Sequence, residues 1–553
     1  MHLHETHRLR EDAALLNWLY NTFWATWIRK AGTVLVVLAV AVPATLLLPA
    51  KFGAPEHCAE GVEKSAGECI GVNGSGYDFG VPEIRKVTEA IRKENARVTG
   101  QKASVTVAMM LPLQPKLPAE RKQLRSELQG AYLAQYRANR TEKTPLLRLV
   151  LANPGADYAQ QEKVVDQLAA MADSERDNLR AVTGFNLSLG ATKQAVARLT
   201  DELKIPVLAS RVSADEIANP DNPAGRLPFP GLARIIPTNR QQADALAHFH
   251  GGLRDAETVL VRDVRPHDIY DESLAKAFSR PEPGPPGPKD QVFESPGIND
   301  PGQTGNHFSL IGHNICESDA HVVYFAGRPV HLRLFALKLA EVPCHGKKYT
   351  IVSGSGAATL DRYLTDDDWK KLRGDGGNPT ITVQYAAPGH PDAWDVALRT
   401  WEKQQADAGR KPAAADRSAY LTDPRRELQE LRALIDQQTA GDIGPVQLED
   451  SRTMLVHDGV RTVAEAVFLA NAQVVGSIPS RERVAAEWPR LEAAHRVRGT
   501  SGWICLTNGG NAYDKPVAVV QLDPRTRKVA FVGLGWPEKK PQPAECVVPS
   551  GTR

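Results

Sequence analysis

Strand and helix patterns alternate from residue 104 to about residue 210, and this alternation restricts the chain to few folds. Short apolar runs such as "SVTVAMML" and "LLRLVLAN" are typical of strands that are buried on both faces. The segment between them, "ERKQLRSELQGAYLAQYRAN", has apolar residues three and four positions apart, which predicts a helix. Strands that alternate with helices form right-handed βαβ units, in which helices cover both faces of a parallel sheet. We therefore expect an α/β protein.

The same alternation begins again after residue 237. The strand patterns "ETVLVRD", "AHVVYFAG", "KKYTIVSG" and "PTITVQYA" are separated by helical or loop segments. Two such arrays predict two lobes, which suits a chain of 553 residues. Ligands of open α/β sheets bind at the carboxyl ends of the strands, so a site is expected there.

One segment differs from the composition of a soluble protein. Residues 31–50 contain 20 residues without a charge, which is long enough to cross a bilayer as a helix. Arg29 and Lys30 directly precede this segment, so the positive-inside rule places residues 1–30 in the cytoplasm and the rest of the chain outside. A cleaved signal peptide is the alternative, but the apolar stretch is long and begins late for one.

The segments on either side of this helix also have expected roles. Residues 1–30 contain an amphipathic pattern rich in tryptophan, which favours the inner membrane surface. Residues 51–100 combine a short loop between two cysteines, the turn-rich stretch "GVNGSGYDFG" and a helical pattern. We expect them to form an extracellular stalk.

All six cysteines follow the apolar segment. An even number in an exported domain indicates disulfide bonds, although six cysteines allow many pairings. The simplest pairing joins sequence neighbours: Cys58 with Cys69, Cys316 with Cys344, and Cys505 with Cys546. Free, buried thiols are the alternative. The spacing of the six cysteines does not resemble that of a zinc site.

Charge and motifs exclude several classes of function. The chain has 67 basic and 65 acidic residues, so it lacks the basic surplus of a nucleic-acid-binding protein. It contains no HExxH, Walker or GxGxxG motif, and "SGSGAA" lacks the spacing of a nucleophile elbow. We therefore expect no catalytic residue, no metal, no cofactor and no nucleic-acid partner. Without an ATPase or a permease of its own, the chain would need partner subunits for uptake or signalling.

The order of these patterns resembles the type I periplasmic-binding-protein-like fold, and within it the leucine/isoleucine/valine-binding and extracellular ligand-binding receptor family. The similarity covers about residues 101–546. It rests on the order of "ELQGAYLAQYRAN", "VTGFNLSLGATKQAVARLTDELKIPVLASRVSADEI", "GLARIIPTNRQQADALAHF", "HDIYDESLAKAF", "HVVYFAGRP" and "HDGVRTVAEAV". No single motif is specific, whereas their order over more than 400 residues is.

The resemblance implies two Rossmann-like lobes, joined by three crossovers, that close over a small ligand. Lobe 1 would comprise residues 101–237 and 389–500, and lobe 2 residues 238–388 and 501–546. A single transmembrane helix would precede them.

The turn "GFNLSLGAT" matches the one that binds a ligand's carboxylate in this family. N–H groups at a helix N-terminus and Ser/Thr hydroxyls form such anion sites in general. By the resemblance, Ser188 is a binding serine and Thr192 caps or lines the same turn. Ser213 stands where the family has a binding threonine, and Tyr270 where it has a pocket tyrosine. Helix caps or a core aromatic are the alternative roles.

Two further ligand-binding candidates depart from the family. Ser353 stands where the family often has an acid that holds the ligand's amine, and Arg328 replaces an aromatic. The loss of an anion and the gain of a cation argue against an ordinary zwitterionic amino acid. A more acidic ligand, a different amide or a vacated pocket remain open, and Arg328 as a solvated surface charge is the alternative.

We therefore predict a membrane-anchored extracellular receptor for a small polar ligand, which is amino-acid-like, an amide or a small acid. Its partners would be permease, ATPase or signalling subunits. The main alternative is a structural protein that keeps the fold without a ligand, and an extracellular hydrolase is a more distant one.

Overall fold

The structure is a computed structural model. Besides residues 18, 22, 26 and 27, it describes residues 57–99, 103–221, 225–250, 258–279, 290–344, 346–410, 419–473, 478–542 and 545–549. The expected transmembrane helix at 31–50 and most of the segment 1–30 lie outside these residues. Within the described part, no helix has both the length and the apolar composition needed to cross a membrane. From Cys58 onward the chain forms one compact unit.

The first sheet has, in the described part of the chain, eight strands in the order β1-β2-β3-β5-β4-β6-β7-β8. The neighbours from β5 to β8 pair in parallel, as the sequence alternation predicts. These strands are β4 (Ser104–Met110), β5 (Leu146–Asn153), β6 (Leu179–Thr183), β7 (Val207–Ala209) and β8 (Leu232–Arg234). The helices between them are α4 (Pro118–Ala138), α5 (Gln161–Asp173) and α6 (Gly190–Ala197). This sheet and its helices form lobe 1.

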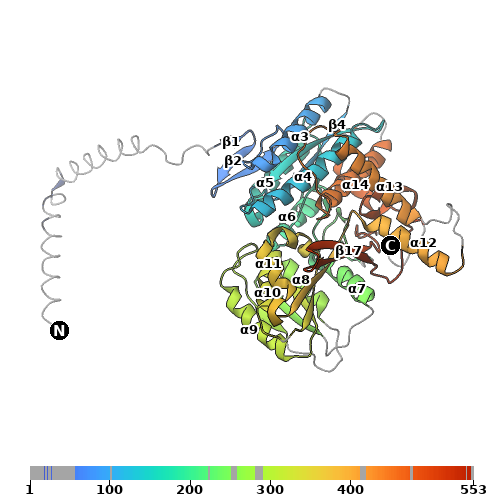
Figure 1. Cartoon of the computed structure of the whole chain (residues 1–553). Helices are drawn as coiled ribbons and strands as arrows, with labels where there is room; N and C mark the ends of the chain where they lie inside the picture. Colours follow the sequence, from blue (N-terminus) through green and yellow to red (C-terminus); the bar gives the residue numbers. More distant parts are fainter. Residues whose placement is uncertain are drawn as a thin grey trace. The chain divides into compact units, whose positions relative to one another are not determined.

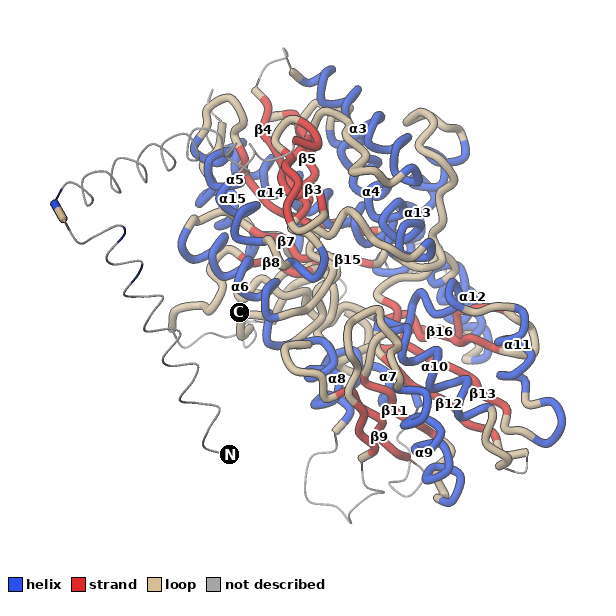
Figure 2. The backbone as a smooth tube through the Cα atoms, turned by 90° about the vertical axis from the view of Figure 1, so that its left-hand side faces the viewer, coloured by secondary structure: helices blue, strands red, loops and turns tan. Residues whose placement is uncertain are grey.

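The second sheet, over the same described residues, has seven strands in the order β10-β9-β11-β12-β13-β16-β17 and lies apart from the first in Figure 2. The parallel strands are β9 (Thr258–Asp263), β10 (Gln291–Phe293), β11 (Val322–Ala326), β12 (Lys348–Ser353) and β13 (Thr380–Ala387). The antiparallel strands are β16 (Val517–Asp523) and β17 (Lys528–Gly535). The helices are α7 (Asn239–His250), α8 (Ile269–Phe278), α9 (Thr304–Glu317), α10 (Pro329–Ala340) and α11 (Asp366–Arg373). Together they form lobe 2.

The chain returns to lobe 1 after β13. This part contains α12 (Ala393–Asp407), α13 (Ala419–Asp436), α14 (Arg452–Ala472), α15 (Arg481–Ala486) and the hairpin of β14 (Val497–Gly499) and β15 (Gly502–Ile504). Helix α14 packs along α4, far from it in sequence (Figure 1). The two helices approach so closely at Gly130 that a Cβ there would lie 2.4 Å from the Thr453 carbonyl oxygen, which requires glycine.

The predicted stalk is wrong for residues 57–99, because this segment belongs to lobe 1. It contains β1 (His57–Ala59), β2 (Val62–Ser65), β3 (Glu68–Asn73) and α3 (Arg85–Val98). Strand β3 pairs antiparallel with β5, and the Asn95 side-chain amide of α3 donates to the Leu149 carbonyl oxygen at 2.7 Å. Buried Val87 and Ile91 hold α3 in the core of the lobe.

The third crossover lies later than the predicted boundary at residue 501. Strand β15 pairs with β14, and the Arg234 amide of β8 donates to the Gly510 carbonyl oxygen at 2.8 Å, so both segments belong to lobe 1. The chain enters the second sheet only at Val517. The boundary was misplaced because the strand patterns on both sides of the crossover look alike in sequence.

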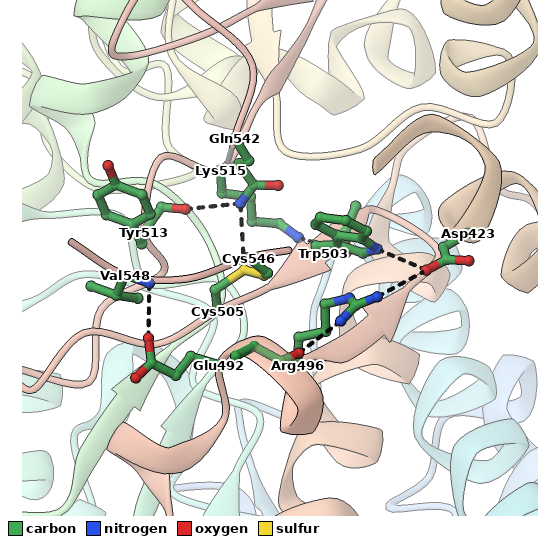
Figure 3. The surroundings of a disulfide bond; sticks show 12 residues. Asp423, Glu492, Arg496, Trp503, Cys505, Tyr513, Lys515, Gln542, Cys546 and Val548 are labelled. Atoms are coloured by element: carbon green, nitrogen blue, oxygen red, sulfur yellow. Dashed lines mark hydrogen bonds and ion pairs between the residues drawn. A yellow bond between two sulfur atoms is a disulfide. The ribbon is translucent and has the colours of Figure 1, made fainter. Parts of the chain in front are cut away.

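The three predicted disulfides are confirmed. Cα–Cα distances are 5.9 Å for Cys58–Cys69, 5.6 Å for Cys316–Cys344 and 5.9 Å for Cys505–Cys546. Figure 3 shows the last of these, where the Gln542 side-chain amide donates to the Tyr513 carbonyl oxygen at 2.9 Å. The disulfide and this hydrogen bond hold the C-terminal segment around Gln542 and Cys546 against residues 505–513, beside the third crossover.

Candidate functional site

A cavity of about 450 Å³ lies between the two lobes. Lobe 1 contributes the segment after β4, one face of α4, the turn before α6 and the start of α14, whereas lobe 2 contributes α8 and the segments after β11 and β12. Pro112 follows the carboxyl end of β4, Asn186 follows β6 and Arg328 follows β11. The cavity therefore lies where open α/β sheets bind their ligands.

The predicted binding turn borders this cavity. Ser188 and Ser213 both line it. The Ser188 hydroxyl accepts a hydrogen bond from the Ala214 amide at 3.3 Å, and the Ser188 carbonyl accepts one from the Tyr270 amide at 3.0 Å. The turn is therefore fixed to its own lobe through the side chain and to lobe 2 through the backbone.

Thr192 does not line the cavity, although it belongs to the same turn in the sequence. Thr192 belongs to α6 and its side chain is fully buried. Its hydroxyl has no hydrogen-bond partner among the described residues. Ser353 is also absent from the lining, because it lies at the end of β12 and donates its hydroxyl to the Phe325 carbonyl oxygen at 2.9 Å. The structure therefore separates these two candidates from the other four.

Tyr270 lines the cavity from α8. Its phenol oxygen accepts a hydrogen bond from the Gly356 amide at 2.9 Å, and burial raises the pKa of the phenol, which stays neutral. A Cβ at residue 356 would lie 2.8 Å from this oxygen, so the contact depends on glycine. The Arg328 guanidinium carbon lies 4.7 Å from the centre of the Tyr270 ring, within cation–π range.

Arg328 lines the cavity but its guanidinium is already paired. Its Nε and Nη2 donate to the two Asp268 carboxylate oxygens at 2.9 and 2.6 Å, and Arg265 contacts the same carboxylate. Burial opposes ionisation of Asp268, but the Arg328 guanidinium lowers the pKa of this carboxyl overall. The alternative of a solvated surface arginine is wrong, since Arg328 is only 6% exposed. Its Nε and Nη2 are therefore occupied by Asp268 and not available to a ligand anion.

The sequence patterns did not predict a cluster of charged residues at the buried end of the cavity, which we call the inner end. Glu127 of α4 is 1% exposed and accepts from Arg452 Nη1 at 2.6 Å and from Arg211. Asp450 pairs with Arg362 of lobe 2 at 2.7 Å. Burial raises the pKa of Asp450, and burial lowers the pKa of Arg211 to about 10. The only local signal was that Arg211 directly follows the strand pattern "IPVLAS".

Carboxylates line the more exposed end of the cavity, which we call the outer end. Here Asp157 is exposed and Glu120 is partly buried. Burial raises the pKa of both groups, and the charge of Asp157 raises that of Glu120 further. Glu68 of β3 joins them, since its Oε2 accepts from the Ala156 amide at 2.9 Å. The segment expected to be a stalk therefore supplies one wall of the cavity.

Solved structures share this fold. A leucine-binding protein LivK from Thermotoga maritima has 18% identity over 79% of this chain and 100% of its own, with a TM-score of 0.50. The branched-chain amino acid transporter substrate-binding protein LivJ from Streptococcus pneumoniae, solved with isoleucine, has 14% identity over 78% and 99%, with a TM-score of 0.53. An ABC transporter substrate-binding protein from Aeropyrum pernix has 13% identity over 80% and 98%, with a TM-score of 0.50.

No family model and no curated protein sequence matches the chain. At these identities the structural similarity defines the fold and not the ligand. The type I periplasmic-binding-protein-like fold predicted from the sequence is confirmed, with two α/β lobes and a cavity between them.

Proposed function

We propose that the chain is an extracellular solute-binding receptor that closes its two lobes over a small polar ligand. One observation carries this proposal: charged and polar side chains of both lobes line the same cavity of about 450 Å³. A ligand in contact with both lobes favours the closed state through its differential affinity for that state. The names of the structural neighbours, which bind leucine or isoleucine, support an amino-acid-like ligand.

The cavity favours this function over a scaffold without a ligand. A scaffold would fill the space between the lobes with packed apolar side chains, as protein cores do. Ser188, Ser213 and Tyr270 instead border an open space. The non-enzymatic names of the neighbours and the absence of a catalytic motif in the sequence also favour binding over hydrolysis.

A thermal-shift screen of the full chain in mild detergent against amino acids, amides and small acids tests the proposal. At least one ligand is expected to raise the melting temperature. Ala156→Trp places a large ring at an exposed position of the cavity wall and should abolish the shift, whereas Ala159→Trp, exposed and outside the cavity, should not. If no ligand changes the melting temperature, the scaffold is the better description.

We further propose that residues 31–50 anchor the receptor in the cell membrane, with residues 1–30 in the cytoplasm and the two lobes outside. Arg29 and Lys30 support this orientation. Permease and ATPase or signalling subunits would then receive the ligand or its signal. A reporter that is active only outside the cytoplasm should be active when fused after Arg553. Activity of a reporter that works only in the cytoplasm would contradict this topology.

A further inference from the structure

One face of α4 runs along the cavity. Glu120, Gln123, Leu124 and Glu127 all line it, at the spacing of residues that share a helix face. Glu127 follows Glu120 by seven positions, and each position adds about 1.5 Å along the axis. Glu120 and Glu127 therefore lie about 10 Å apart along the helix axis and face different ends of the cavity.

Two arginines and two acids line the inner end and pair with one another: Arg211, Arg452, Glu127 and Asp450. Arg362, outside the lining, pairs with Asp450 as well. Arg452 is 9% exposed and lines the cavity, and its Nε makes no hydrogen bond in the described part of the chain. This buried guanidinium N–H can donate to a ligand, so the inner end suits a ligand carboxylate.

The outer end carries two carboxylates, Glu120 and Asp157, that form no ion pair among the described residues. The charge of Arg452 acts on Glu120 from a distance, and those of Arg265, Arg328 and Lys116 act on Asp157. Lys116 lines the same end but is exposed to solvent, and Arg328 is held by Asp268. This end therefore suits a cationic group of a ligand.

Amide side chains also line the cavity. Gln123 occupies the α4 face between Glu120 and Glu127, and Gln114, Asn186 and Asn299 also line the cavity. Asn186 donates to Glu127 at 3.2 Å, so it lies at the inner end. Side-chain amides can both donate to and accept from peptide groups.

We propose, on the basis of the solute-binding function above, that the ligand is an extended zwitterion, specifically a peptide of about three residues. Its C-terminal carboxylate binds at Arg211 and Arg452, and its N-terminal ammonium binds at Glu120 and Asp157. A single amino acid carries both charges on one carbon and cannot reach both ends. An extended peptide spans about 3.3–3.6 Å per residue, so three residues cover about 10 Å.

Calorimetric titration of the full chain with alanine, dialanine, trialanine and tetra-alanine tests the length. Trialanine is expected to bind about tenfold or more tightly than alanine. Acetylation of its amine or amidation of its carboxylate should each weaken binding about tenfold, since each removes one charge contact. An unbranched ω-amino acid of matching length has the same two charges without peptide groups, and should bind more weakly than trialanine.

A protein variant tests the outer end independently. Glu120→Gln keeps an oxygen that accepts from the Leu117 amide but removes the charge, and should weaken trialanine binding about tenfold. It should not change binding of N-acetylated trialanine. Glu162→Gln, which also removes an acid from the first turn of a helix but lies outside the cavity, is the matched control.

Each alternative outcome has a definite meaning. Alanine that binds as tightly as trialanine, or end-capped peptides that bind as well as free ones, would overturn the extended ligand while leaving the receptor function intact. An ω-amino acid that binds as tightly as trialanine would overturn the peptide. If no tested amino acid, amide, acid or peptide binds, both the ligand assignment and the receptor function fail.

Discussion

The Tyr270 amide donates to the Ser188 carbonyl oxygen at 3.0 Å, and this hydrogen bond joins the two lobes beside the cavity. A second link lies nearby, where the Ser273 hydroxyl of α8 donates to the Asp215 carboxylate of lobe 1 at 2.8 Å. These two hydrogen bonds hold the lobes together beside the cavity. A ligand that contacts both lobes adds further links between them and favours this arrangement through its differential affinity.

Ser188→Ala separates the two roles of this residue. The substitution removes the hydroxyl that accepts from the buried Ala214 amide, but keeps the carbonyl that accepts from Tyr270. The free energy of unfolding should fall by about 1 kcal/mol, and ligand binding should weaken by about 1–3 kcal/mol if the hydroxyl also contacts the ligand. Denaturant unfolding and calorimetry measure the two effects.

Thr192→Val is the matched control for Ser188→Ala. The Thr192 hydroxyl is buried without a partner among the described residues and does not line the cavity. Valine has nearly the same shape, so stability should be unchanged or slightly higher, and binding should not change. Weaker ligand binding in the Thr192 variant would show that the Thr192 hydroxyl takes part in binding.

Arg328→Met should destabilise the fold by about 3–5 kcal/mol, because it leaves the fully buried Asp268 carboxylate with a weakened counter-charge. Arg333→Met, which removes a more exposed partner of Asp368, should cost less, about 1 kcal/mol. Chemical denaturation at pH 7 compares the two variants. Equal losses would mean that the Arg328–Asp268 pair contributes no more than a surface pair.

The same pair predicts the acid sensitivity of the protein. Since the pKa of Asp268 is lowered in the folded state by Arg328, the unfolded state binds the proton more readily. The stabilisation is therefore complete above a pH of about 4 and is lost as the pH falls through the folded-state pKa. Arg328→Met should show a smaller loss of stability below pH 4 than the natural chain.

The sequence predicted those parts of the fold that local patterns determine. Strand runs such as β4 and β5 are continuous and apolar, so the α/β class and the two lobes followed from them. The β1–β3 segment has short strands with few apolar residues, and its pairing with β5 joins residues about 80 positions apart. No local pattern encodes such a pairing, so the segment looked like a stalk.

The candidate site likewise combines features that local sequence patterns predict with contacts between residues far apart in the sequence. The turn at Ser188 and the position of Tyr270 were predicted from the resemblance to the binding-protein family, which rests on the order of local motifs. The Arg328–Asp268 ion pair joins two residues 60 positions apart, which no local pattern predicts. The arginine group around Glu127 brings together residues from α4, the segment after β7 and α14, and only the packing of α4 on α14 reveals it.

Asp514, at the third crossover, should make stability decrease between about pH 4 and pH 7. The carboxyl is 4% exposed, and burial raises its pKa to about 7. The folded state then holds a proton that the unfolded state has released, so stability is full below the unfolded pKa of about 4 and falls as the pH rises.

Asp514→Asn should remove this slope, which is at most about 1.4 kcal/mol per pH unit. The amide oxygen can still accept from the Glu538 backbone, which Asp514 Oδ1 does at 3.1 Å. Asp523→Asn, which removes an acid from a turn outside the crossover, is the control. Urea unfolding at pH 5, 6 and 7 measures the slope, and an unchanged slope in the Asp514 variant would place its origin elsewhere.

The Cys58–Cys69 disulfide should control the cavity wall that Glu68 forms. Cys69 is adjacent to Glu68, and its amide donates to the Gln114 side chain, which also lines the cavity, at 2.6 Å. The double variant Cys58→Ser/Cys69→Ser opens a loop closed over 11 residues and should cost about 2–4 kcal/mol of stability. Hydrogen exchange should then rise in β1–β3, and ligand affinity should fall because Glu68 loses its fixed position.

The double variant Cys316→Ser/Cys344→Ser gives the matched comparison, because this disulfide closes 28 residues within lobe 2 and neither cysteine lines the cavity. It should lower stability by a similar amount and leave ligand affinity unchanged. Mass spectrometry of non-reduced digests must first show both bonds in the natural chain. If loss of Cys58–Cys69 loosens β1–β3 without weakening binding, Glu68 borders the cavity but does not hold the ligand.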